Sequence, residues 1–241
     1  MYFREVMKVQ LGEKLVEELG VHVVFDLGPF AITESVFNTW ILLFILMIAC
    51  ILLTRGFTVE NPGKRQLAVE SFVVWIRNLT HNMLGEEAAG YSWFTMTMLV
   101  FIGISNMSAL IETAVSDQYT FMKPPTKDLN VTIALALMSI IIVEIAGIKR
   151  KGVGGWLKSF TKPIAIITPI NILEIFIRPL SLCMRLFGNI FGGFIIMELI
   201  KILVPFVVPL PFSCFFEIFD ALLQAYVFVF LTSIYLSEAV E

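Results

Sequence analysis

One stretch organises the interpretation of the whole chain, and it reads Ser181-Leu-Cys-Met-Arg185-Leu-Phe-Gly-Asn-Ile-Phe-Gly-Gly193. It places Arg185 in the middle of an apolar run that extends from about residue 170 to about residue 208. Arginine stays protonated at any biological pH, and a cation at the centre of a bilayer costs about 3 kcal/mol or more. We therefore expect Arg185 to be a functional residue.

The residues around Arg185 predict a helix face with almost no side chains. On a helix that advances about 100° per residue, Gly188, Asn189 and Gly192 fall within roughly 60° of Arg185. Small residues allow another backbone to approach closely, as they do between membrane helices. We expect the partner to be a different subunit that bears an acidic group. The alternative is a structural arginine that reaches a lipid headgroup or pairs within the chain.

The composition predicts an all-α membrane protein. The chain has 241 residues, of which 58% are hydrophobic and 15% charged, and its mean hydropathy is +0.86. The apolar runs are continuous rather than alternating, which favours membrane helices over an outer-membrane barrel. Cys50, Cys183 and Cys214 lie inside apolar runs and are interpreted as small hydrophobic residues. We expect no cofactor, no metal site and no nucleic acid partner.

The apolar runs predict about five transmembrane helices in a single polytopic membrane domain that covers residues 36–241. Residues 1–35 alternate charged and apolar positions, with a helical pattern around residues 9–19, and are interpreted as an external segment at the membrane surface. Residues 65–84 are amphipathic and predict a helix at the cytoplasmic surface. The predicted spans are at about 36–53, 93–113, 129–148, 171–203 and 212–237.

A basic loop sets the predicted orientation. Lys149-Arg-Lys151 is followed by Lys158 and Lys162, and no acidic residue lies between Lys149 and Lys162. By the positive-inside rule this loop is cytoplasmic. The N-terminus is then outside and the C-terminus is cytoplasmic.

The last two predicted helices are longer than a membrane requires. About 33 and 26 residues correspond to roughly 50 and 39 Å of helix, against a hydrocarbon core of about 30 Å. Because few charges lie along them, steep tilt explains this length better than projection into water. We expect the two helices to form a tilted hairpin.

A polar track continues from Arg185 toward the cytoplasmic end of its helix. At the same advance of about 100° per residue, Glu174, Arg178 and Ser181 lie within roughly 40° of Arg185 around the helix axis. They are interpreted as the lining of an inner aqueous pathway. The alternative is that Glu174 and Arg178, spaced i and i+4, form a simple salt bridge.

The last helix carries a second polar stripe. Glu217, Asp220 and Gln224 are spaced i, i+3 and i+7 and therefore share one face. Such groups in a transmembrane helix face water or another polar group rather than lipid. Carboxylates crowded in a medium of low dielectric constant hold or pass protons. We expect an outer pathway, separated from the inner one by Arg185, that is lined by Glu112, Glu198, Glu217 and Asp220.

The stretch around Arg185 resembles the signature of subunit a of bacterial F-type ATP synthase. The resemblance covers roughly residues 90–241. Further segments that carry it are Pro125-Thr-Lys-Asp-Leu-Asn-Val-Thr132, Ile148-Lys-Arg-Lys-Gly-Val-Gly-Gly155, Pro169-Ile-Asn-Ile-Leu-Glu174 and Leu223-Gln-Ala-Tyr-Val-Phe228.

The resemblance implies a non-catalytic stator subunit in the inner (plasma) membrane of a bacterium. Its partners are expected to be the c-ring, the b subunits of the peripheral stalk and the lipid bilayer. Arg185 matches the arginine that interacts with the ring carboxylates, Gln224 matches a glutamine beside it, and Glu217 matches an outer half-channel residue. The acidic or histidine residue expected nine positions after the arginine is replaced by Phe194, and Glu198 is the candidate to take its place.

Two other functions fit the residues without the resemblance. A stand-alone secondary ion transporter or channel would conduct ions as a purified chain. A membrane scaffold would tolerate the loss of Arg185. In the stator hypothesis the chain provides two offset half-channels for protons or sodium ions and couples their flow to ATP synthesis.

Overall fold

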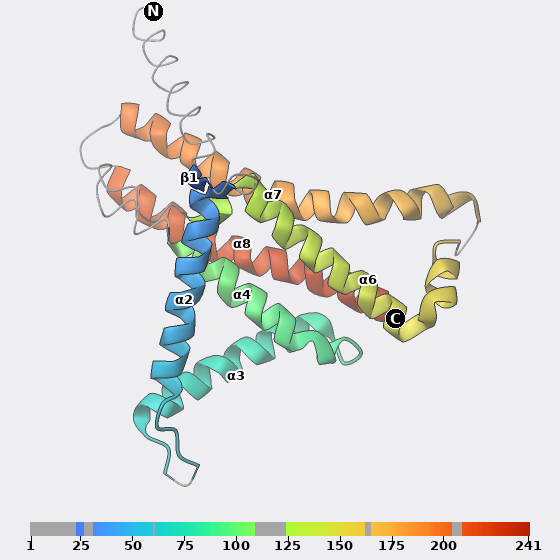
Figure 1. Cartoon of the computed structure of the whole chain (residues 1–241), viewed down its shortest axis with the longest axis horizontal. Coiled ribbons are helices and arrows are strands. Elements are labelled where there is room, and N and C mark those ends of the chain that lie inside the picture. The colour runs from blue at the N-terminus through green and yellow to red at the C-terminus, as the bar shows by residue number, and fades with distance from the viewer. Residues whose placement is uncertain (1–22, 27–30, 60, 109–123, 162–164, 204–208) are drawn as a thin grey trace, which may run out of the picture.

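The computed structural model describes residues 23–26, 31–59, 61–108, 124–161, 165–203 and 209–241. These residues form a helical membrane-type fold, as the composition predicts (Figure 1). Short 3-10 turns precede three of the helices: η1 (Ala89–Tyr91), η2 (Pro125–Lys127) and η3 (Ala165–Ile167). The helices are α2 (Glu34–Thr54), α3 (Lys64–Leu84), α4 (Ser92–Met107), α6 (Leu129–Ser159), α7 (Thr168–Leu203) and α8 (Pro209–Val240).

Two short strands near the N-terminus are an addition to the all-α fold that the sequence predicts. β1 (Val23–Asp26) pairs antiparallel with β2 (Ala31–Thr33), with Phe25 opposite Ile32. The strands consist largely of β-branched and aromatic residues on either side of a Gly-Pro turn signal, which favours a hairpin. The helical pattern expected around residues 9–19 lies outside the described residues.

Three helices within the described ranges are long and apolar enough to cross a membrane: Glu34–Thr54, Leu129–Ser159 and Ile218–Val240. The surface of α2 shows why lipid is needed. This helix buries only Asn38 and Leu42, whereas Trp40, Phe44 and Ile51 are each more than half exposed. Apolar surface in water costs about 25 cal/mol per Å², so this surface requires an apolar solvent.

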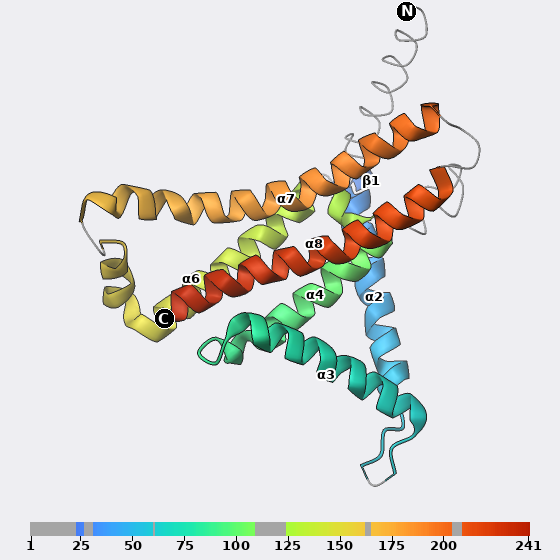
Figure 2. The same ribbon diagram turned by 180° about the vertical axis from the view of Figure 1, so that it is seen from behind.

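The last two helices are the longest in the described part of the chain. α7 has 36 residues and α8 has 32, which corresponds to roughly 54 and 48 Å. α7 continues through Pro179. Both views show α7 lying crosswise to α2, while α8 runs alongside α4 and α6 (Figures 1 and 2).

The core lies where α4, α6, α7 and α8 meet. Leu182 and Leu186 of α7 and Phe228 of α8 are completely buried there. α4 packs closely on α8, since a methyl group placed on Gly103 would lie 3.7 Å from the Cβ atom of Ala225. This packing buries one side of α7 at the level of Arg185.

The basic segment after residue 148, predicted as a cytoplasmic connection, is helical on both sides of a kink. α6 continues to Ser159 across a kink at Gly152, where φ is 71° and ψ is 160°. Beyond the kink, Trp156 folds back, and its Nε1 atom donates a hydrogen bond of 2.7 Å to Glu144. One glycine in a backbone conformation that other residues avoid therefore reverses the helix without a loop.

Gly152→Ala should loosen this turn, whereas Gly154→Ala should not. A side chain at a positive φ outside the usual regions costs about 1–3 kcal/mol. Gly154 has no atom within 4 Å of an added methyl group and no unusual φ. We expect Gly152→Ala to speed trypsin cleavage at Lys151 and Lys158 in detergent-solubilised protein. Equal cleavage rates for the two variants would contradict this account of the kink.

Candidate functional site

Arg185 lies on the surface of α7 beside a fully buried face. Its side chain is exposed, whereas Leu182 and Leu186 are completely buried and Cys183 is 4% exposed. Arg185 forms no hydrogen bond or ion pair with any residue whose side chain the structure describes. Its charge is therefore not neutralised by the described part of the chain.

The glycines that follow Arg185 are not required by packing within the described chain. A methyl group placed on Gly188 or Gly192 would meet no atom within 4 Å. Gly147 differs, because its added methyl group would lie 3.4 Å from the carbonyl oxygen of Ala239. The face predicted to be almost bare is thus open space, available to a molecule outside the chain.

Asn189 and Gln224 join α7 to α8. The Nδ2 atom of Asn189 donates a hydrogen bond to Oε1 of Gln224 at 2.5 Å. Gln224 is completely buried, and its Nε2 atom has no hydrogen-bond partner within the part of the chain that the structure describes. A buried amide donor left without a partner costs about 1–3 kcal/mol, so this unpartnered donor calls for an explanation beyond packing.

A second buried amide lies at the end of α4. Asn106 accepts a hydrogen bond of 2.6 Å from Thr126, and its own Nδ2 atom has no partner among the described residues. Gly103, one turn earlier on α4, packs against Ala225, the neighbour of Gln224. The two unpartnered amides therefore belong to the same α4–α8 contact.

Arg178 is neutralised by described side chains, whereas Arg185 is not. Its Nη2 atom lies 2.9 Å from Oε1 of Glu174 and 2.9 Å from Oε2 of Glu238. Its guanidinium carbon lies 4.7 Å from the centre of the Tyr235 ring. The salt bridge between residues 174 and 178, considered from their spacing, is present, and Glu238 extends it from α7 to α8.

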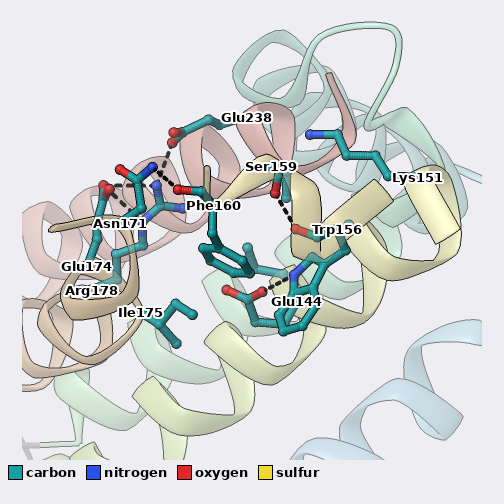
Figure 3. A pocket seen from close by; sticks show the side chains of 13 residues that line it. Glu144, Lys151, Trp156, Ser159, Phe160, Asn171, Glu174, Ile175, Arg178 and Glu238 are labelled. Atoms are coloured by element: carbon teal, nitrogen blue, oxygen red, sulfur yellow. Dashed lines mark hydrogen bonds and ion pairs between the residues drawn. The ribbon is translucent and has the colours of Figure 1, made fainter. Parts of the chain in front are cut away.

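A polar cleft surrounds this ion pair between α6, α7 and α8 (Figure 3). Its volume is about 260 Å³. On one side, Asn171 donates a hydrogen bond of 2.8 Å to the carbonyl oxygen of Phe160. The charged side chains that line the cleft are Glu144, Lys151, Glu174, Arg178 and Glu238.

The remaining predicted site residues are not joined to Arg185 in the described structure. Ser181 and Asp220 are half-buried, and neither side chain forms a hydrogen bond or ion pair there. Glu112 lies outside the described residues, as do the side chains of Phe194, Glu198 and Glu217. Their roles in an outer pathway remain predictions.

Sequence reasoning missed the partners of Arg178 on α8. Tyr235 and Glu238 are spaced i and i+3, so they share a face. A signal was available, because a hairpin of two long helices brings the start of the first close to the end of the second. The expected hairpin thus contained the information needed to pair Arg178 with Glu238.

Known proteins resemble this chain along most of its length. The family model described as ATP synthase A chain matches residues 36–237. ATP synthase subunit a of Moorella thermoacetica is 34% identical over 218 residues, which cover 90% of this chain and 95% of that relative. The similarity extends well before residue 90, where the resemblance of individual motifs begins.

Leucine at position 188 should be tolerated by the isolated chain, whereas leucine at position 147 should not. Gly188→Leu enters open space on a helix and should leave the free energy of unfolding unchanged or raise it by up to about 1 kcal/mol. Gly147→Leu meets Ala239 and Trp156 and should lower it by about 1–3 kcal/mol. Unfolding in mixed detergent micelles measures both values. Equal destabilisation would show that residue 188 packs against the chain itself.

Proposed function

Because the chain belongs to the ATP synthase A chain family, we propose that it is the stator subunit against which a c-ring rotates. Membership itself makes the chain a non-catalytic, ion-translocating subunit of the membrane sector of an ATP synthase. The finer proposal is that Arg185 interacts with the ring carboxylates. Two offset half-channels then carry protons or sodium ions to and from that contact.

The unneutralised charge of Arg185 is the observation that carries the proposal. An exposed guanidinium without a described partner, on a helix that lies in an apolar surround, requires an anion from outside the chain. The open space at Gly188 and Gly192 provides room for another helix to approach. A ring of subunits that each present a buried carboxylate meets both requirements.

The amides at the α4–α8 contact support an outer half-channel. Buried N–H donors that lack a protein partner are normally satisfied by water. The unpartnered donors of Asn106 and Gln224 therefore support a hydrated path that ends at Asn189, one turn from Arg185. In this proposal Glu112, Glu198, Glu217 and Asp220 line the outer part of the path.

The cleft around Arg178 supports an inner half-channel. It contains the carboxylates of Glu144, Glu174 and Glu238, and Ser181 lies on α7 between the cleft and Arg185. Arg185 separates the two paths, because a fixed cation interrupts a continuous proton wire while it attracts a passing carboxylate. Each unit charge that crosses contributes about 2.3 kcal/mol per 100 mV.

The membrane topology completes the proposal. We assign five spans, an external N-terminus and a cytoplasmic C-terminus, with α7 and α8 as a tilted hairpin against the ring. The lengths of α7 and α8 support the tilt, since both exceed the thickness of the hydrocarbon core. The b subunits of a peripheral stalk would hold the subunit against rotation.

Arg185→Ala should abolish ATP-driven ion pumping. The ring carboxylate loses its counter-charge, and the barrier between the half-channels is lost. We expect a fall of more than about 100-fold in membrane vesicles that contain the whole complex, with assembly retained. Arg77→Ala is the matched control, because Arg77 is an exposed arginine on α3 and should leave pumping unchanged.

Two results would contradict this proposal. Coupled pumping retained by Arg185→Ala would favour a scaffold with a merely structural arginine. Ion transport by the purified chain alone in lipid vesicles would favour a stand-alone transporter or channel.

Gln224→Leu and Glu217→Gln should reduce pumping less severely than Arg185→Ala. Neither change removes the positive charge of Arg185, so we expect pumping rates to fall by about tenfold or less. A tenfold fall corresponds to about 1.4 kcal/mol in the free-energy barrier. Initial pumping rates in the same vesicles, normalised to the amount of assembled complex, measure the effect. A loss as complete as that of Arg185→Ala would overturn this ranking.

A further inference from the structure

We propose that Arg178 is a positioning residue: with Glu238 and Tyr235 it locks α8 against α7 on the inner side of Arg185, and so keeps the two half-channels separate. This inference rests on the function proposed above. Arg178, Glu174 and Glu238 border the proposed inner half-channel, and the inference assigns Arg178 and Glu238 the task of holding the two helices together rather than that of carrying the ion.

The contacts of Arg178 have the character of a clamp. Its side chain is 13% exposed, while the side chains of Glu174 and Glu238 are 47% and 59% exposed. Glu174 receives two hydrogen bonds from the guanidinium, from Nε and from Nη2, and thus orients it along α7. The Nη2 atom is then directed to Glu238, and Tyr235 covers the guanidinium face (Figure 3 shows the two carboxylates).

A clamp of this kind is stronger than an ordinary surface ion pair. Hydrogen bonds between charged groups are about twice as strong as neutral ones, and partial burial of the guanidinium reduces screening by water and salt. The pair between Arg150 and Glu87 provides a contrast, at 3.9 Å with both side chains more than half exposed. Such an exposed pair contributes little.

The second link between α7 and α8 lies on the other side of Arg185. Arg178 and Asn189 are 11 residues apart on α7, and Gln224 and Glu238 are 14 residues apart on α8, or roughly 16 and 21 Å of helix. Arg185 lies between the two links. Its segment of α7 is therefore held to α8 at both ends.

Loss of one link would let α8 pivot about the other. Between the two links, Phe228 and Val229 of α8 are completely buried. Their apolar side chains form no hydrogen bonds, so they do not fix how far α8 can slide or rotate against its neighbours. A looser seam between α7 and α8 would let water bypass Arg185. The expected defect is therefore a leak, with ions crossing without rotation, rather than a block.

The test compares ion uptake with ATP hydrolysis in the same inverted membrane vesicles, using the whole complex. Glu238→Gln removes the negative charge that α8 contributes to the clamp and keeps a side chain of nearly the same volume. We expect ATP hydrolysis to stay within about twofold of the native rate, while ions taken up per ATP fall at least about threefold and passive ion leak rises. Glu87→Gln, which removes only the exposed pair, should match the native complex in all three quantities.

A charge exchange separates positioning from conduction. The double variant Arg178→Glu with Glu238→Arg keeps one cation between two carboxylates, because Glu174 remains beside it. We expect this variant to recover at least about half of the native ratio of ions to ATP. Groups that carried the ion would not be restored by exchange, so a failure to recover would overturn the positioning role.

The aromatic partner provides an independent check. Tyr235→Phe keeps the ring over Arg178 and should retain the native ratio, whereas Tyr235→Leu should lower it. Arg178→Gln should also lower the ratio of ions to ATP, and if that variant fails to assemble, the Tyr235 variants and Glu238→Gln decide the outcome. Equal ratios for Glu238→Gln and Glu87→Gln would refute the inference. Coupled pumping retained by Arg185→Ala would instead refute the proposed function itself, whatever the clamp variants show.

Discussion

The free energy of a permanent cation in an apolar surround is the constraint on which the rest of this structure depends. α7 contains two arginines, seven residues apart, and their surroundings differ. Arg178 is held by Glu174 and Glu238 and is nearly covered. Arg185 has no partner among the described side chains and lies beside open space. The paired charge of Arg178 stabilises the contact between α7 and α8. The charge of Arg185, which has no described partner, is available to an anion from outside the described chain.

The sequence predicted which side chains share one face of a helix, and it did not predict which side chains on different helices touch. The period of about 3.6 residues fixes which side chains share a face, so the polar stripe of Glu174, Arg178 and Arg185 follows from spacing alone. Helical periodicity contains no information about which helices touch or in what register. The Asn189–Gln224 bond therefore became visible only in three dimensions. The Arg178–Glu238 pair required the hairpin as well as the periodicity, because only the hairpin brings the start of α7 close to the end of α8.

Local patterns did not show where one residue redirects the chain. The sequence predicted a basic connection after residue 148, and glycine is unfavourable inside a helix. Gly152 alone adopts the positive φ, and the residues on both sides remain helical. The reversal is then stabilised by a contact that spans 12 residues, from Trp156 to Glu144. The strand pair before α2 differs, because its β-branched and aromatic residues already favour a hairpin.

These features share one consequence: the described surroundings of Arg185 hold its segment of α7 in place without neutralising its charge. The buried side of α7 holds it through Leu182 and Leu186, which are apolar. The nearest described polar link to α8 is formed by Asn189 and Gln224, which are neutral amides. The carboxylate of Glu174 on the same stripe is paired with Arg178, which lies two turns before Arg185 on α7. An acidic residue in place of Asn189 would lie one turn from Arg185 and would pair with it within the chain, so the ring carboxylate of the proposed function would then have no free charge to meet.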